Sequence, residues 1–153
     1  MAPQGTSAAP RVTATPAPAR VVGDVLRASA RLAPGSPAIA GDEATLSHAG
    51  LDAEADRLAA ALAGAGFAPG ACIGAMLPNS LEYGLLFFAA ARAGVVLANL
   101  PTRASGRELA GMVALAGMRG LFVHRDFAAQ VAAARAEGAE LARVVEVGGP
   151  DTR

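Results

Sequence analysis

The sequence predicts an α/β fold in which a parallel sheet carries helices on both faces. Between residues 72 and 100, two short apolar runs flank a longer one, with Pro78, Asn79 and Gly94 among the turn residues between them. Strands are about 4–8 residues long and helices at least about 10–12, so the lengths indicate strand, helix, strand. The central run, residues 81–93, is apolar almost all round, and we expect that helix to be buried. A crossover of this kind is typical of a parallel sheet covered on both faces.

Composition limits the classes of protein to which the chain can belong. Its 153 residues, of which 53% are hydrophobic, suffice for one domain with a core. The net charge is zero and no basic patch stands out, which argues against a nucleic-acid partner. One cysteine excludes an internal disulfide and fits a reducing, cytoplasmic compartment. Arg92 interrupts the best candidate for a membrane span, so none is expected. All 13 basic residues are arginine, so no lysine of this chain can bind a phosphate or a carboxylate.

The first 20 residues are predicted to be a disordered leader, because prolines recur among alanine, serine and threonine. They lack the apolar core of a secretory signal. The absence of acidic residues is a feature of transit peptides, but the prolines argue against the amphipathic helix that such peptides need. The predicted organisation is a leader at 1–20, an α/β unit at 21–149 and a tail at 150–153.

Residues 21–33 form the first predicted helix, with apolar residues at helical spacing and Asp24 in the first turn, where a negative charge suits the helix dipole. Pro34 and Gly35 end it. Two short strand candidates, 37–40 and 44–46, surround the turn residues 41–43, so a hairpin is expected there.

From Ser47 onward the predicted helices and strands alternate. Ser47 caps a helix that runs to about residue 63, with Asp52, Glu54 and Asp56 on its solvated outer face. A strand begins at Cys72.

The second half of the alternation has its own start and stop signals. Asn79 is the predicted N-cap of the helix at 81–93, with Glu82 three residues on, where its carboxylate can reach back to the first amides. Ser105 and Glu108 predict a capping box that opens the next helix. A strand at 121–124, a helix at 127–137 and a strand at 143–147 follow. This order predicts a twisted parallel sheet with right-handed crossovers.

Glycines and cysteine are common in binding loops and active sites, but in this sequence they are predicted to have structural roles. Gly64 and Gly66, with Gly70, suggest a dinucleotide loop, but they follow a helix and precede a strand, so a helix exit and turn are favoured. Cys72 has no positive neighbour in sequence to stabilise a thiolate and is predicted to be a buried strand residue rather than a nucleophile.

The two histidines give no catalytic set either. His48 directly follows Ser47, and such adjacency does not form a charge-relay geometry. His124 closes a strand at the edge where open α/β sheets bind ligands, yet a solvated strand end is favoured over a site. No cluster has metal-ligand spacing. We therefore assign no catalytic, cofactor-binding or metal-binding residue, and the substrate-binding residues are unknown.

The chain from about residue 21 to 149 resembles the N-terminal part of the adenylate-forming enzymes, which include acyl- and aryl-CoA synthetases, AMP ligases and adenylation domains. Each matching motif is weak alone, but their order and spacing are specific; they lie at residues 45–51, 56–59, 66–70, 78–82, 88–96, 100–101 and 105–109. Three positions depart from the family pattern: His48 replaces a tyrosine, Gly50 a glutamate and Ala71 an aspartate. These are structural positions, so the expected fold stands.

The resemblance implies a parent ligase that converts a carboxylate and ATP into an acyl-adenylate and pyrophosphate, and then into a thioester. ATP and Mg²⁺, with CoA or a phosphopantetheine carrier as acceptor, are implied for that parent and not for this chain. The family's phosphate loop and catalytic lysine lie downstream of the matched segment. The chain is therefore predicted to be an inactive N-terminal fragment whose partner is the rest of the ligase, in the same chain or a split one.

Two other hypotheses stay open. One is a free-standing, non-catalytic α/β interaction module, and the other a small domain that binds a nucleotide itself. An isolated unit is also expected to expose an apolar face, through which it could self-associate.

Overall fold

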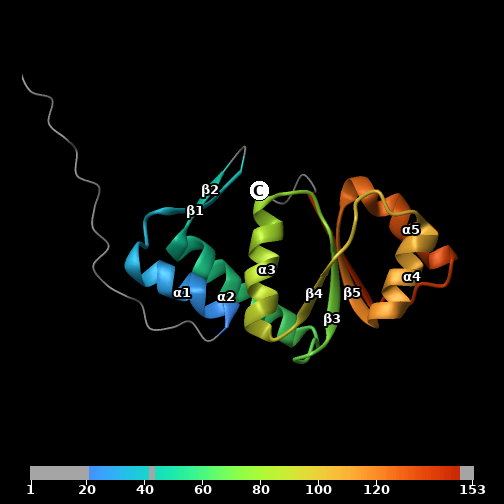
Figure 1. The fold of residues 1–153 in the computed structure, drawn as a ribbon, viewed down its shortest axis with the longest axis horizontal. Coiled ribbons are helices and arrows are strands. Elements are labelled where there is room, and N and C mark those ends of the chain that lie inside the picture. Colours follow the sequence, from blue (N-terminus) through green and yellow to red (C-terminus); the bar gives the residue numbers. More distant parts are fainter. Residues whose placement is uncertain (1–20, 42–43, 149–153) are drawn as a thin grey trace, which may run out of the picture.

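The computed structural model describes residues 21–41 and 44–148. The predicted leader, part of the hairpin turn and the predicted tail lie outside these residues. Helices and strands alternate along most of the described chain (Figure 1): α1 (Val22–Leu32), β1 (Pro37–Ala40), β2 (Thr45–Ser47), α2 (His48–Gly64), β3 (Cys72–Met76), α3 (Leu81–Ala93), β4 (Val96–Asn99), α4 (Gly106–Ala116), β5 (Met118–His124), a 3-10 turn (Arg125–Phe127), α5 (Ala128–Ala136) and β6 (Arg143–Val147).

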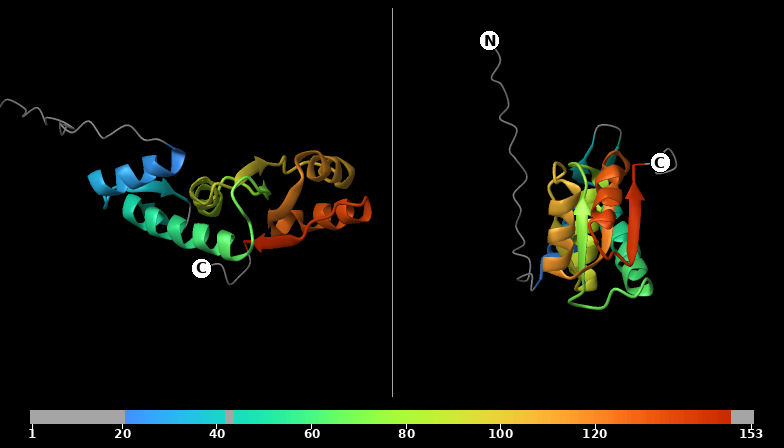
Figure 2. Two further views of the ribbon diagram at one scale, coloured as in Figure 1. Left: turned by 90° about the horizontal axis from the view of Figure 1, so that it is seen from below. Right: turned by 90° about the vertical axis from the view of Figure 1, so that its right-hand side faces the viewer.

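Four strands form one parallel sheet in the order β4-β3-β5-β6. Helices α2 and α3 pack on one face, and α4 and α5 pack on the other (Figure 2). All five residues of β3 are buried because this strand lies inside the sheet, between β4 and β5. The predicted fold class, a parallel sheet with helices on both faces, is confirmed.

Alternate residues of β5 divide the core into two layers. Leu121 and Val123 point to the face of α4 and α5, where they meet Leu109 and Val113. Phe122 points to the opposite face and joins the cluster formed with α2 and α3. This period of two assigns each side chain of the strand to one layer.

A third cluster lies at the end of the molecule away from α4 and α5 (Figure 1). Leu26 of α1 packs there against Leu51 and Ala55 of α2. The predicted hairpin is confirmed, since β1 and β2 pair antiparallel with Ile39 opposite Leu46. Ile39 also lies so close to α3 that a Cβ at Gly84 would come within 2.3 Å of its Cδ1.

The N-cap predicted for α3 is wrong by one residue. Ser80, not Asn79, has the extended backbone of a cap, and its Oγ accepts a hydrogen bond from the Tyr83 N–H at 3.3 Å. Glu82 is then the second helical residue, so the spacing for a reciprocal bond to the cap is lost. Its charge still suits the positive end of the helix dipole.

Two further expectations need adjustment. Helix α3 is buried at Leu86, Ala89 and Ala90 and partly buried elsewhere, but Phe87 is 43% exposed. Strand β5 begins at Met118, three residues earlier than predicted, because Gly120 interrupts the apolar pattern. That glycine is required by packing, since a Cβ there would lie 2.6 Å from the Phe67 ring.

Candidate functional site

The carboxyl edge of the parallel sheet is the natural place for a site in this architecture. Strands β3, β4, β5 and β6 end there at Met76, Asn99, His124 and Val147. The helices that follow β3 and β4 also begin at this edge, where free backbone N–H groups can bind an anion. An anion can bind there only if no side chain of the protein already occupies the helix start.

Both helix starts are capped by the chain's own side chains. Ser80 caps α3, as described above. At α4 the predicted capping box is confirmed: the Ser105 N–H donates to Glu108 Oε2 at 2.8 Å, and the Glu108 N–H donates to Ser105 Oγ at 3.3 Å. Hydrogen bonds from the Ser105 backbone and then its hydroxyl hold the pKa of Glu108 below its ordinary value. The capping carboxylate thus occupies the end of α4 that an anion would need.

The described residues do not by themselves fit an ATP–Mg²⁺ site. Carboxylates at Glu82 and Glu108 lie in the first turns of α3 and α4, where they oppose a nucleotide phosphate. Within residues 21–41 and 44–148, no group of three or more His, Cys, Asp or Glu side chains is arranged to hold a metal ion.

His124 is held locally at the end of β5. Its Nδ1 accepts a hydrogen bond from the Asp126 N–H at 3.3 Å, and Asp126 Oδ2 lies 3.3 Å from the same nitrogen. The ring lies 5.9 Å from the Phe127 ring, and a Cβ at Gly148 would come within 2.4 Å of Nε2. The side chain is 23% exposed, so it is a packed contact between the ends of β5 and β6 rather than the solvated strand end that we predicted.

Cys72 lies at the other end of the sheet, where β3 begins. It is a buried free cysteine, and desolvation raises the pKa of its thiol. The prediction of a buried strand cysteine is confirmed. A thiol that resists ionisation is poorly suited to act as a nucleophile.

The pair Ser47–His48 joins the hairpin to α2. Ser47 Oγ accepts a hydrogen bond from the Gly50 N–H at 3.1 Å, which confirms the predicted cap. The His48 N–H donates to the Ser36 carbonyl at 3.0 Å. Both residues therefore serve the start of α2.

The glycine group after α2 is a helix exit, as predicted. Gly64 is the last residue of α2, and Gly66 has a φ of 87° in the left-handed region. The turn that follows reaches β3 through Gly70, whose φ is 83°. These backbone conformations explain Gly66 and Gly70 without a bound nucleotide.

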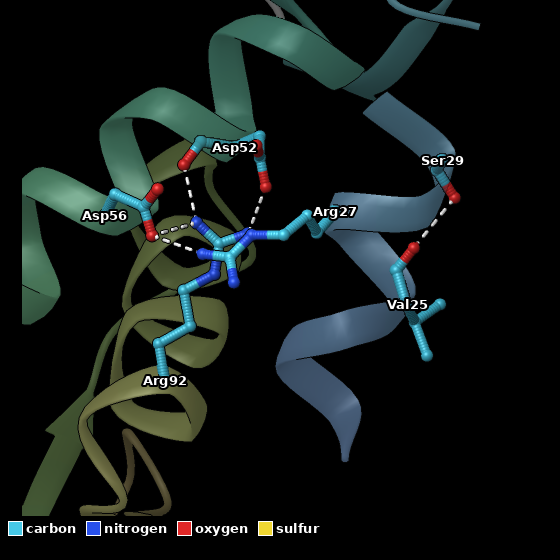
Figure 3. A network of polar contacts seen from close by, with 6 residues as sticks. All are labelled: Val25, Arg27, Ser29, Asp52, Asp56 and Arg92. Carbon is cyan, nitrogen blue, oxygen red and sulfur yellow. Dashed lines mark hydrogen bonds and ion pairs between the residues drawn. The ribbon is translucent and has the colours of Figure 1, made fainter. Parts of the chain in front are cut away.

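The acidic face of α2 is only partly solvated, because one of its three acidic residues is largely covered. Arg92 of α3 lies between Asp52 and Asp56 with a side chain only 7% exposed (Figure 3). Its Nη1 donates to the Asp52 carbonyl at 2.6 Å and to Asp56 Oδ1 at 2.8 Å, and its Nη2 pairs with Asp52 Oδ1. Arg27 of α1 donates to Asp56 Oδ1 at 3.0 Å, so one network joins three helices. The prediction holds for Glu54 and Asp56, whose side chains are 41% and 54% exposed, and fails for Asp52, which is 21% exposed. Glu54 forms an exposed pair with Arg57.

An open cavity of about 670 Å³ lies at the amino edge of the sheet, away from the carboxyl edge. The end of α4, the start of β5 and the loop before β6 form it. Met118 and Leu141 contribute apolar surface, and Arg119 and Glu140 are its ionisable lining residues. No sequence pattern indicates this cavity, because the two loops come together only through the strand pairing.

Comparison with known proteins places the chain in a family. The sequence profile described as "AMP-binding enzyme" matches residues 26–151, most of the chain. The chain belongs to the AMP-binding enzyme family. Over 106 residues it is 38% identical to the indoleacetate–CoA ligase of Aromatoleum aromaticum, covering 69% of this chain and 21% of that protein. Over 78 residues it is 38% identical to the salicyl-AMP ligase / salicyl-S-ArCP synthetase of Mycobacterium tuberculosis, covering 51% of this chain and 14% of that protein.

Solved structures of AMP-binding enzymes show the same architecture. A Mycobacterium tuberculosis fatty acyl CoA synthetase superimposes with a TM-score of 0.79 at 25% identity, covering 83% of this chain and 26% of that one. The N-terminal domain of FACL13 from the same organism gives a TM-score of 0.80 at 24% identity, covering 88% and 35%. The chain thus corresponds to the N-terminal region of acyl- and aryl-CoA ligases and spans only a minor part of their length. No helix of the described residues is long and apolar enough to cross a membrane.

Proposed function

We propose that this chain is the N-terminal part of an ATP-dependent ligase that activates a carboxylic acid, and that it does not catalyse the reaction alone. The observation that carries the proposal is the family match over residues 26–151, together with the shared fold over about a quarter to a third of each solved ligase chain. In the whole enzyme a carboxylate and ATP would form an acyl-adenylate and pyrophosphate. Transfer to CoA or to a phosphopantetheine carrier would then give a thioester.

The side-chain geometry supports a scaffolding role. Glu82 and Glu108 place negative charge at the starts of α3 and α4, two helices that begin at the carboxyl edge. The chain also has no lysine with which to bind the carboxylate and α-phosphate. ATP and Mg²⁺ would therefore be held by the rest of the ligase, which is the proposed partner, either in the same chain or as a separate one.

The substrate class is proposed from the relatives. Both curated relatives are named for aromatic carboxylic acids, indoleacetate and salicylate. An aryl acid is therefore the first choice for the ligase, with fatty acids as the second, since a fatty acyl CoA synthetase shares the fold.

The test is ATP–pyrophosphate exchange by the purified chain with salicylate, indoleacetate and a fatty acid, one at a time. We expect exchange no faster than in buffer, while the complete indoleacetate–CoA ligase serves as positive control. Exchange by the chain alone would overturn the proposed inactivity. The gene gives a second readout: a reading frame that continues past Arg153 into a Ser/Thr/Gly-rich segment supports one continuous ligase. A stop codon there supports a split ligase or the non-catalytic module instead.

A further inference from the structure

The cavity at the amino edge combines an apolar floor with open space beside it. Val113 and Met118 are 3% and 4% exposed, and Leu141 packs against the same core cluster. Gly117 follows α4 and Gly138 follows the end of α5, both with a left-handed backbone, and a Cβ at either would meet no atom within 4 Å. The volume of about 670 Å³ lies within the roughly 300–1,000 Å³ that small-molecule sites occupy. The cavity therefore has room for a ligand with an apolar part.

Two opposite charges line the cavity without pairing with each other. Arg119 belongs to the start of β5, and Glu140 lies in the loop between α5 and β6. Both residues are exposed, and within the described ranges 21–41 and 44–148 neither takes part in an ion pair. Since these two charges do not neutralise each other, each can meet an opposite charge on a ligand.

The helix ends add to the negative charge around the cavity. Helices α4 and α5 pack side by side on one face of the sheet, and each connects two parallel strands, so both end at the amino edge (Figure 1). The C-terminal end of a helix carries a partial negative charge, and its last carbonyls have no partner within the helix. The last turn of α4 has no basic residue, whereas Arg135 offsets part of the charge at the end of α5. An ammonium group is thus favoured beside Glu140 and the helix ends, and a carboxylate beside Arg119.

We propose that this cavity binds a small zwitterion with an apolar side chain, the chemistry of a free apolar amino acid. The ammonium group of the ligand pairs with Glu140, and its carboxylate pairs with Arg119. The apolar side chain lies on the floor formed by Val113, Met118 and Leu141. A molecule with a single charge leaves one of the two lining charges without a partner. A zwitterion without an apolar part leaves the floor exposed to water.

The exposure of both charges predicts weak binding. Ion pairs between exposed groups contribute little, because water and salt screen them. The buried floor supplies the larger share through the apolar surface that the ligand covers. We therefore expect a dissociation constant on the order of millimolar.

Titration of the full chain, followed by the NMR shifts of its backbone amides, tests the proposal. Three ligands share one indole ring: tryptophan is the zwitterion, tryptamine keeps only the ammonium and indole-3-propionate keeps only the carboxylate. Tryptophan should give saturable shifts at the amides of Gly117, Arg119 and Gly138, which line the cavity. It should bind about two- to fivefold more tightly than either singly charged analogue. Free glycine, which lacks an apolar side chain, should give no saturable shift at these amides.

Neutral variants of the two lining charges test which group each one binds. Arg119→Gln should weaken tryptophan and indole-3-propionate about two- to fivefold without weakening tryptamine. Glu140→Gln should weaken tryptophan and tryptamine to the same extent without weakening indole-3-propionate. Arg107→Gln and Glu146→Gln are the matched controls, because both residues are exposed and lie outside the cavity. They should leave the affinity of all three indole ligands unchanged.

The titration of the unmodified chain can refute the proposal without any variant. The absence of a saturable shift at the cavity amides with tryptophan overturns it, as do equal affinities for the three indole ligands. A control variant that weakens binding as much as Arg119→Gln or Glu140→Gln also overturns it. None of these outcomes depends on ligase activity.

Discussion

Replacing Arg92 by alanine should strongly destabilise the fold, because this side chain joins α3 to α2 from a nearly buried position. The guanidinium is 7% exposed and contacts the carboxylates of Asp52 and Asp56 and the Asp52 carbonyl. Its aliphatic stem packs against Gly23 of α1. Removing it leaves the Asp52 carboxylate, 21% exposed, without its partner.

The magnitude follows from the burial of each group. Breaking a buried ion pair by removing one member costs about 3–5 kcal/mol, because the other charge stays desolvated. Asp52 retains some contact with water, which reduces the cost of leaving its charge unpaired. Asp56 is 54% exposed, so the Arg92–Asp56 pair contributes little to folding stability. The buried Nε of Arg92 has no hydrogen-bond partner in the described structure, so one donor of the guanidinium does not contribute to the network. We therefore expect a loss of about 3 kcal/mol, or roughly 6–12 °C in melting temperature.

Urea unfolding followed by circular dichroism measures the effect. Arg57→Ala is the matched control, because it removes an arginine–glutamate pair whose side chains are 68% and 41% exposed. That variant should change stability by no more than about 0.5 kcal/mol. A double-mutant cycle with Asp52→Asn should show a coupling of about 1–3 kcal/mol. If Arg92→Ala costs no more than Arg57→Ala, the three-helix network does not stabilise the fold and the reasoning is refuted.

Two further predictions concern α4. Gly106→Ala places a Cβ 2.5 Å from Ala133 Cβ, where α4 meets α5, and should cost about 1–3 kcal/mol of folding stability. Gly111→Ala is the control, because its Cβ meets nothing within 4 Å, and it should stabilise the fold by about 0.5–1 kcal/mol. Equal effects of the two substitutions in urea unfolding would contradict the close approach of α4 and α5. Glu108→Gln should remove the capping carboxylate, whose folded pKa is lowered by Ser105. A lowered folded pKa gives stability above the unfolded pKa that is lost as pH falls through the folded one. The difference between the unmodified chain and Glu108→Gln should thus be constant near neutral pH and shrink below about pH 4.5, and a difference that grows on acidification would contradict the capping role.

The strands and helices of the parallel sheet could be predicted from the sequence because the patterns that mark them are local. The lengths of the apolar runs and the turn residues between them depend on neighbours along the chain, so the strands and crossover helices were predicted within a few residues. The capping box at Ser105 and Glu108 could be predicted for the same reason, since both partners lie within one turn. At α3 two candidate caps, Asn79 and Ser80, are adjacent, and only the backbone conformation distinguishes them.

Features that depend on contacts between elements could not be predicted. Arg92 and Asp52 are 40 residues apart on different helices, so no spacing rule relates them. Their pairing depends on the crossing of α2 and α3, which the sequence pattern does not show. The acidic residues of α2 were therefore predicted to form a solvated face. The cavity at the amino edge has the same origin. In the same way, the helical spacing of the apolar residues of α1 did not show that Leu26 is buried while Val22, Val25 and Leu32 are exposed.

The helix starts at the carboxyl edge define what this unit can contribute to the proposed ligase. An N-terminus that binds phosphate needs free N–H groups and no nearby carboxylate. Here α3 is capped by Ser80, and α4 is capped by Ser105 and Glu108. These two helix starts therefore stabilise their own helices, and in the proposed ligase the nucleotide phosphates would be bound elsewhere. In the proposed ligase, substitutions at these caps should therefore alter folding stability much more than the chemical step.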